Sequence, residues 1–187
     1  MQRIPKSKFR TGPGDRPFRI ERKMPDISTR FIEQKKKLFD LYFKNLNEKQ
    51  REAVYQINGP LLILAGAGSG KTTVLVNRLA YLTRYGNAYH DPVVPQNAGA
   101  LLAEMEKAEA MNREELGEYL TKFAVNPPPA WSVMAITFTN KAAREIKERI
   151  KKIFGEDSRE AAELMTGTFH SICLQFLRRY GSQIGYD

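Results

Sequence analysis

A glycine-rich loop that runs directly into lysine and threonine is the segment of this sequence best suited to chemistry. Its residues are Ala65, Gly66, Ala67, Gly68, Ser69, Gly70, Lys71 and Thr72. Glycines allow successive backbone N–H groups to turn toward one anion, and a helix that follows adds free donors and partial positive charge. Lys71 would then reach the β- and γ-phosphates of a nucleotide, while the Thr72 hydroxyl would hold Mg²⁺. The loop predicts a nucleotide phosphate site, a feature that kinases, GTPases, ATPases and motor proteins share.

The elements around the loop predict the fold class. Three short apolar runs predict strands: Leu61–Ala65, which should be buried on both faces, Ser132–Phe138 and Met165–Phe169. A helical pattern follows each run: Lys71–Tyr85, Lys141–Phe154 and His170–Tyr180. Alternating strands and helices predict an α/β fold with a parallel sheet, incomplete because only about three strands are present. The glycine spacing is not Gly-x-Gly-x-x-Gly, which argues against a dinucleotide fold.

Two helices, one leader and one insertion complete the predicted organisation. Helical spacing covers Phe31–Phe43 and Glu48–Tyr55, and Asn47 is the expected N-cap of the second helix. Residues 1–30 predict a basic disordered leader, and residues 31–187 a partial nucleotide-binding domain. Residues 86–131, with turn residues, a helical stretch and a triple proline, predict a helical insertion in that domain.

Composition limits the possible functions further. The chain has 187 residues and a net charge of +9, of which residues 1–46 carry +8, so the leader either adds phosphate attraction or is simply solvated. One cysteine, Cys173, and two histidines exclude a disulfide framework and a zinc finger. The longest apolar run is too short to cross a bilayer. We therefore expect a cytoplasmic protein without a membrane partner.

Hydrolysis of a bound nucleotide needs an acid that these strands do not supply. In phosphate-loop ATPases, a carboxylate at the end of a second apolar strand holds Mg²⁺. The runs Ser132–Phe138 and Met165–Phe169 both end without Asp or Glu. The sequence therefore predicts the phosphate cradle without the acid half of the site.

Four segments in order resemble the motifs of superfamily 1 DNA helicases of the UvrD/PcrA/Rep type. They are Leu46–Val54 for the Q motif, Ala65–Thr72 for motif I, Ile136–Ala143 for motif Ia and Thr166–Ser171 for motif Ib. The strict phosphate-loop pattern has glycine where Ala65 stands, but alanine is usual there in this family. The resemblance covers roughly residues 46–187 and implies the N-terminal portion of the first RecA-like domain of such a helicase.

The resemblance also implies roles for individual residues. Gln50 would read the adenine edge, and ATP with Mg²⁺ would be held by Gln50, Ala65, Gly66, Ala67, Gly68, Ser69, Gly70, Lys71, Thr72 and Thr73. Thr73 departs from the arginine that related helicases often carry there. Single-stranded DNA would lie on Phe138, Thr139, Asn140, Lys141, Thr168 and His170. Taken alone, Gln50 could be only a capping residue, Phe138 a core residue and His170 a helix-start residue.

The first interpretation is the ATP-binding part of a 3′–5′ helicase that couples ATP hydrolysis to movement on single-stranded DNA. The remaining motor motifs and the second RecA-like domain are expected beyond residue 187, so the chain alone should be inactive. The alternative is a non-enzymatic nucleotide- or nucleic-acid-binding remnant. A small phosphate-loop kinase fits poorly, because residues 86–131 hold only one arginine, Arg113, and no arginine-rich lid. The oligomeric state and the cellular pathway stay open.

Overall fold

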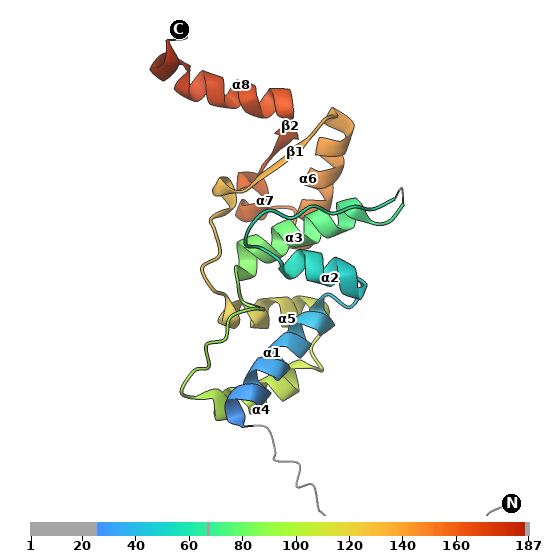
Figure 1. Cartoon of the computed structure of the whole chain (residues 1–187), viewed down its shortest axis with the longest axis vertical. Helices are drawn as coiled ribbons and strands as arrows, with labels where there is room; N and C mark the ends of the chain where they lie inside the picture. The colour runs from blue at the N-terminus through green and yellow to red at the C-terminus, as the bar shows by residue number, and fades with distance from the viewer. Residues whose placement is uncertain (1–25, 67, 186–187) are drawn as a thin grey trace, which may run out of the picture.

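The computed structural model describes residues 26–66 and 68–185, which form a helix-rich α/β structure with a small parallel sheet (Figure 1). The order of the main elements is α1 Ile27–Tyr42, α2 Glu48–Tyr55, α3 Lys71–Tyr85, α4 Ala98–Ala108, α5 Arg113–Leu120, β1 Met134–Thr137, α6 Asn140–Phe154, α7 Arg159–Glu163, β2 Met165–Thr168 and α8 Phe169–Tyr180. Short 3₁₀ turns are η1 Thr121–Phe123, η2 Ala130–Ser132 and η3 Gly181–Ile184. The predicted α/β class with an incomplete parallel sheet is confirmed. None of the helices in the described ranges is long and apolar enough to cross a membrane.

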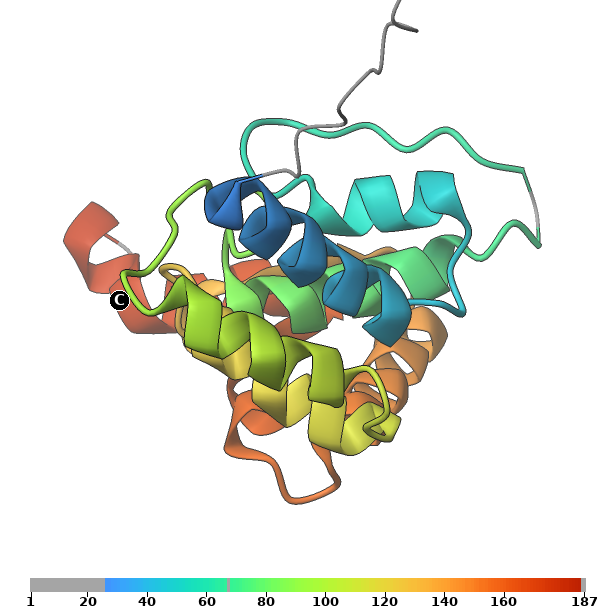
Figure 2. The ribbon, with the colours of Figure 1, turned by 90° about the horizontal axis from the view of Figure 1, so that it is seen from below.

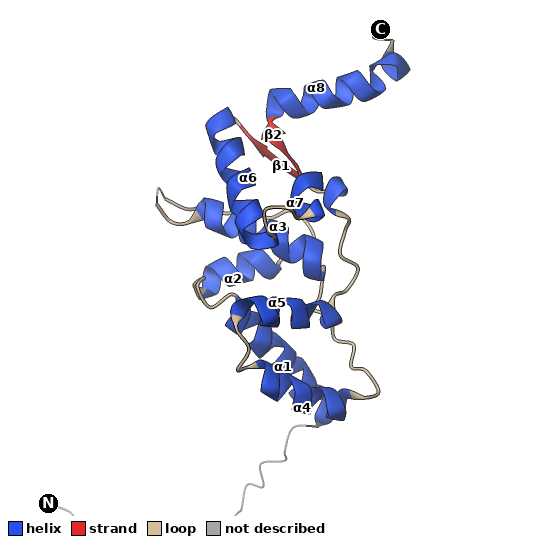
Figure 3. Cartoon of the chain, turned by 180° about the vertical axis from the view of Figure 1, so that it is seen from behind, coloured by secondary structure: helices blue, strands red, loops and turns tan. Residues whose placement is uncertain are grey.

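Strands β1 and β2 pair in parallel and bring their carboxyl ends to one edge. The register runs from Met134 opposite Met165 to Thr137 opposite Thr168. Helices α6 and α7 form the crossover between the strands (Figure 3). Because parallel strands end on the same side, α6 and α8 both begin at this edge. The sheet thereby places the residues after β1 next to those after β2.

The predicted strand over Leu61–Ala65 is wrong for this structure. The segment makes no strand pairing with any described residue, and Leu62 and Leu64 are 81% and 85% exposed. Figure 2 shows it as part of a loop at the periphery of the molecule. An apolar run becomes a buried strand only where other strands occupy its edges and helices cover its faces. Here β1 and β2 pair with each other and with no third strand in the described residues, and the run stays largely exposed.

Helices α1 to α5 enclose an aromatic core. Phe39 of α1 is fully buried and makes edge-to-face contacts with Tyr55, Tyr81, Tyr85 and Tyr89. Such pairs add to the free energy that burial of each ring contributes. These rings come from α1, α2, α3 and the segment after α3, so one cluster holds four parts of the chain together.

A buried lysine fastens α1 to the segment after α3. The Lys35 ammonium donates to the Asp91 carbonyl oxygen at 2.7 Å and lies 3.9 Å from an Asp91 carboxylate oxygen. Burial lowers the pKa of Lys35, and the nearby Asp91 charge opposes this shift. This interaction shows that the start of the predicted insertion packs directly against α1.

Two predicted boundaries change. Helix α1 begins at Ile27, where the Asp26 carboxylate accepts from the Thr29 N–H at 2.9 Å, so residues 27–30 are helical and not part of a disordered leader. Residues 1–25 lie outside the described residues. Within the predicted insertion 86–131, α4 and α5 pack on α1, and Glu109 accepts from Gln34 at 2.6 Å. These helices therefore share the core of the domain.

Helix α3 is shared by two cores. Its Val74, Tyr81 and Tyr85 belong to the aromatic core. Its Val76 and Leu79 belong to a second core with Ala135 of β1 and with Ile146 and Ile150 of α6. The sheet and the helical part therefore meet on α3, the helix that follows the glycine-rich loop.

Helix α8 buries few of its apolar side chains. Ile172 is buried, whereas Phe176 and Leu177 are exposed and Cys173 is partly exposed. Figure 1 shows α8 projecting from the end of β2, away from the other helices. Phe176 and Leu177 therefore lie outside both hydrophobic cores of the described structure.

Replacing Phe39 with alanine should lower the free energy of unfolding by about 3–5 kcal/mol, because it leaves a cavity among the four tyrosines. Urea denaturation followed by circular dichroism measures the change. The exposed Val93→Ala variant is the control and should change stability by less than about 0.5 kcal/mol. Equal losses in the two variants would contradict a central role for Phe39.

Candidate functional site

The glycine-rich loop adopts conformations that require glycine. Gly68 and Gly70 have φ angles of +75° and +82°, in the left-handed region. Ser69 Oγ donates to the Gly66 carbonyl oxygen at 2.7 Å, which closes a turn in the loop. Gly70 precedes α3 and provides no side-chain cap, so the free N–H groups of the first turn of α3 face the loop without a side-chain acceptor from the cap position. Ala67 lies outside the described residues.

The Lys71 side chain lies back across the loop. Its ammonium donates to the carbonyl oxygens of Ala65 at 2.9 Å and Gly66 at 2.6 Å. Both acceptors are neutral backbone groups, and Lys71 remains exposed. A phosphate oxygen could replace them because a charged acceptor makes the stronger hydrogen bond.

Gln50 connects the helix before the loop to the loop itself. Its Oε1 accepts from the Asn47 N–H at 3.0 Å, and the Asn47 side chain accepts from the Gln50 N–H at 2.9 Å, which completes a capping box. Its Nε2 donates to the Ser69 carbonyl oxygen at 3.1 Å. The capping interpretation of Gln50 is therefore confirmed, and the same amide also contacts the loop.

Helix α2, which carries Gln50, is held from two sides. Arg78 of α3 donates to the Ala53 carbonyl oxygen at 2.7 Å and also to that of Gln56, at the end of α2. Burial lowers the pKa of Arg78. From the other side, Asp40 of α1 accepts from the Tyr55 hydroxyl at 3.0 Å. The position of Gln50 at the loop thus depends on both α1 and α3.

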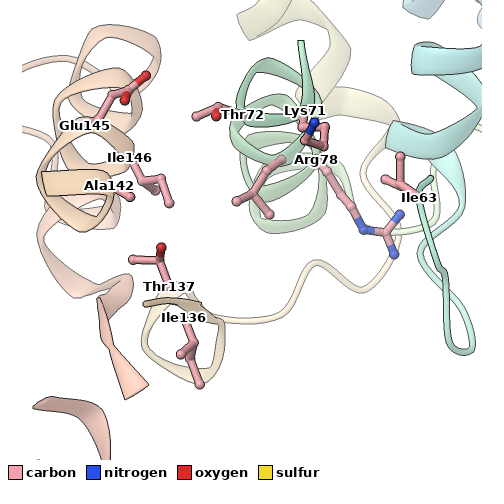
Figure 4. A pocket seen from close by; sticks show the side chains of 10 residues that line it. Ile63, Lys71, Thr72, Arg78, Ile136, Thr137, Ala142, Glu145 and Ile146 are labelled. Carbon is pink, nitrogen blue, oxygen red and sulfur yellow. The ribbon is translucent and has the colours of Figure 1, made fainter. Parts of the chain in front are cut away.

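A cavity of about 300 Å³ lies between the start of α3, β1 and α6 (Figure 4). It is lined by Ile63, Lys71, Thr72, Leu75, Arg78, Ile136, Thr137, Ala142, Glu145 and Ile146. Figure 4 shows Lys71 and Thr72 leaving α3 in different directions, with Thr72 on the side of α6. The cavity joins the predicted phosphate site to the end of β1, because Thr137 is the last residue of that strand.

Two residues of α6 near this cavity were not predicted as site residues. Glu145 supplies the one carboxylate among the lining residues, and it pairs with Arg149 at 2.7 Å. Arg149 also donates to the Thr73 hydroxyl at 3.3 Å. Glu145 and Arg149 are four residues apart on α6, a spacing at which opposite charges pair, but this spacing alone indicates a solvent-facing pair. The second contact directs Thr73 toward α6, on the side of α3 where Thr72 also lies.

The predicted DNA-contact residues gather at the carboxyl edge of the sheet. Phe138 follows β1 and is 96% exposed, so it is not a core residue. Thr139 caps α6 and Thr168 caps α8, each accepting through Oγ1 from a backbone N–H at 3.2 Å. Asn140, Lys141 and His170 are exposed in the first turns of these helices. The structure thus brings all six residues to one edge, while two of the hydroxyls serve as caps.

These features define the class of protein. A glycine-rich loop before α3 and a two-stranded parallel sheet are consistent with a partial RecA-like helicase domain. A sequence model of the UvrD/REP helicase N-terminal domain matches residues 46–94 and 116–187. The chain therefore belongs to the UvrD/REP helicase family, as its motifs predict. Residues 95–115, which include α4, fall outside the match.

Individual relatives agree with the family assignment. The chain is 37% identical over 144 residues to the ATP-dependent DNA helicase PcrA of Staphylococcus epidermidis, which covers 77% of this chain and 14% of that protein. It is also 37% identical over 143 residues to PcrA of Staphylococcus aureus, covering 76% of this chain and 14% of the relative. The chain thus spans a small part of the length of these relatives.

Replacing Gly70 with alanine should destabilise the protein by about 1–2 kcal/mol, because an L-residue is strained at its φ of +82°. The added Cβ would also lie 3.0 Å from Gln50 Nε2. Thermal unfolding by circular dichroism should show a midpoint lower by several degrees. Gly66→Ala is the matched control, since no atom lies within 4 Å of its Cβ position. Identical midpoints for the two variants would argue against a requirement for glycine at position 70.

Proposed function

We propose that this chain is the ATP-binding N-terminal part of a 3′–5′ DNA helicase, which couples ATP hydrolysis to movement on single-stranded DNA. The observation that carries the proposal is that one cavity is lined by Lys71, Thr72 and Thr137. Thr137 directly precedes the exposed Phe138 in the sequence. The cavity brings the candidate phosphate site and the candidate DNA edge into one structural unit. The proposed compartment is the cytoplasm.

The nucleotide would bind at the start of α3. Its phosphates would lie on the loop Ala65–Gly70, where the helix dipole and the free N–H groups of α3 favour an anion. Lys71 would exchange its two carbonyl acceptors for phosphate oxygens, and Thr72 would contribute its hydroxyl to Mg²⁺. Gln50, beside Ser69, would contact the adenine edge once its amide leaves the loop carbonyl.

Single-stranded DNA would bind along the carboxyl edge of the sheet. Phe138 offers an exposed ring on which a base can stack, an interaction worth about 1–3 kcal/mol per base. Asn140, Lys141 and His170 can donate to phosphates and bases from the adjoining helix ends. A nucleotide-dependent change at Thr72 would reach this edge through Thr137 across the cavity.

Lys71→Ala should weaken ATP binding about tenfold or more, since a charge-assisted hydrogen bond contributes about 1.5–3 kcal/mol. Isothermal titration of ATP with Mg²⁺ into both proteins measures the difference. Lys107→Ala, at an exposed position on α4, is the charge-matched control and should bind ATP as the wild type does. Equal affinities of the Lys71 variant and the wild type would exclude the phosphate site.

ATP turnover by this chain would exclude the alternative, a non-enzymatic binding remnant. Within the described residues β1 and β2 are followed by Phe138 and Phe169, not by an acid that could hold Mg²⁺. Glu145 lines the cavity but pairs with Arg149. We therefore propose that the chain by itself binds ATP without catalysing its hydrolysis.

The expected steady-state ATPase rate with excess single-stranded DNA equals that of the Lys71→Ala variant. A DNA-stimulated rate that is lost in Lys71→Ala would show that the chain itself is an ATPase. In that case, loss of the rate in Glu145→Gln would identify Glu145 as the missing acid. Retention of the rate in that variant would place the acid elsewhere.

A further inference from the structure

Helix α6 has the highest net charge of any helix in the described ranges. Between Asn140 and Phe154 it carries six Lys and Arg residues and two Glu residues, a net charge of +4. Residues 47–187 together carry only +1, so α6 is a local concentration of positive charge outside the N-terminal segment. Such a concentration attracts a polyanion.

Four of the α6 cations lie on one side of the helix. They are separated by three or four residues, which places them above one another, and all four are exposed: Lys141, Arg144, Lys147 and Lys151. We call them the α6 basic stripe. The buried residues Ala143, Ile146 and Ile150 occupy a different side of the helix, and Ile146 and Ile150 pack into the second core. The stripe is therefore a surface of charged groups without apolar side chains.

Most of this charge is not neutralised within the described residues. Lys141, Arg144 and Lys147 have no ion-pair partner there, while Lys151 lies 3.5 Å from the exposed Glu156. Glu145 forms an ion pair with Arg149, which also contacts Thr73 of α3. Glu148, next to the stripe, is the one remaining acid of α6. The stripe therefore has four exposed positive charges, and Glu148 is the one adjacent negative charge on the same helix.

The α6 basic stripe begins where the proposed DNA edge ends. Lys141 lies in the first turn of α6, three residues after the exposed Phe138. Ten residues separate Lys141 from Lys151, a rise of about 15 Å along the helix. The stripe is therefore long enough to contact more than one phosphate of a single strand.

We propose that the α6 basic stripe is a second nucleic-acid surface, which binds the phosphodiester backbone of single-stranded DNA leaving the Phe138 edge. The inference rests on the proposed DNA-binding function. It extends that function beyond Lys141 to Arg144, Lys147 and Lys151, which lie outside the four helicase motifs. An apolar or membrane partner fits poorly, because the apolar side chains of α6 face the core. A flexible polyanion with regularly spaced charges fits best.

The test compares charge reversals in the full chain. Arg144→Glu combined with Lys147→Glu changes two exposed stripe residues. Lys44→Glu combined with Lys107→Glu is the matched control, because it changes the net charge equally at two exposed positions on the helical part. Binding of fluorescent oligothymidylate, a single strand longer than the about 4–16 nucleotides of a typical site, is measured by anisotropy over a range of salt.

The stripe variant should bind about tenfold more weakly than the control, and the slope of log affinity against log salt should fall by about 1.4. A slope equal to that of the control would overturn the stripe. If Phe138→Ala alone abolishes binding while the stripe variant matches the control, the proposed DNA edge stands and only the stripe fails. No binding by the wild type would overturn both. An oligoglutamate that competes as well as the DNA would reassign the stripe to acidic polypeptides.

Discussion

The packing of α3 between two cores is the constraint on which the candidate site depends. Tyr81 and Tyr85 fix one side of the helix in the aromatic core, while Val76 and Leu79 fix another against β1 and α6. A helix held on both sides cannot rotate without loss of packing in one core. Its first turn, which carries Lys71, therefore has a defined direction although the loop before it is exposed.

Features with local physical causes could be predicted from the sequence. The bounds of α2 and α3 agree with the expected ones, because a capping box starts α2 and Gly70 precedes α3. The two strands near Ala135 and Thr166 were also predictable, since their apolar runs lie between helical patterns. The same pattern places Phe138 after a strand, and parallel pairing then accounts for its neighbours across the edge.

Features that depend on distant partners could not be predicted. The run Leu61–Ala65 has the composition of a buried strand, but strand formation depends on neighbours that its own sequence does not specify. The contact of Arg149 with Thr73 joins residues 76 positions apart, so no local spacing indicates it. Gln50 combines a local and a distant contact. Its capping contact with Asn47 follows from their spacing, whereas its hydrogen bond to Ser69, 19 residues away, could not be predicted from spacing.

The exposed run Leu61–Leu64 also affects how the protein behaves at high concentration. Its backbone lacks strand partners in the described structure, and its side chains are apolar, uncharged and exposed, which favours contact with another molecule. Pro60 and Gly66 flank the run and act as natural gatekeepers against its extension. Association through this segment requires two molecules, so its rate rises with protein concentration. Packing of the segment against its own molecule has no such dependence on concentration. Dilution therefore favours the dispersed protein, and a high protein concentration favours assembly through Leu61–Leu64.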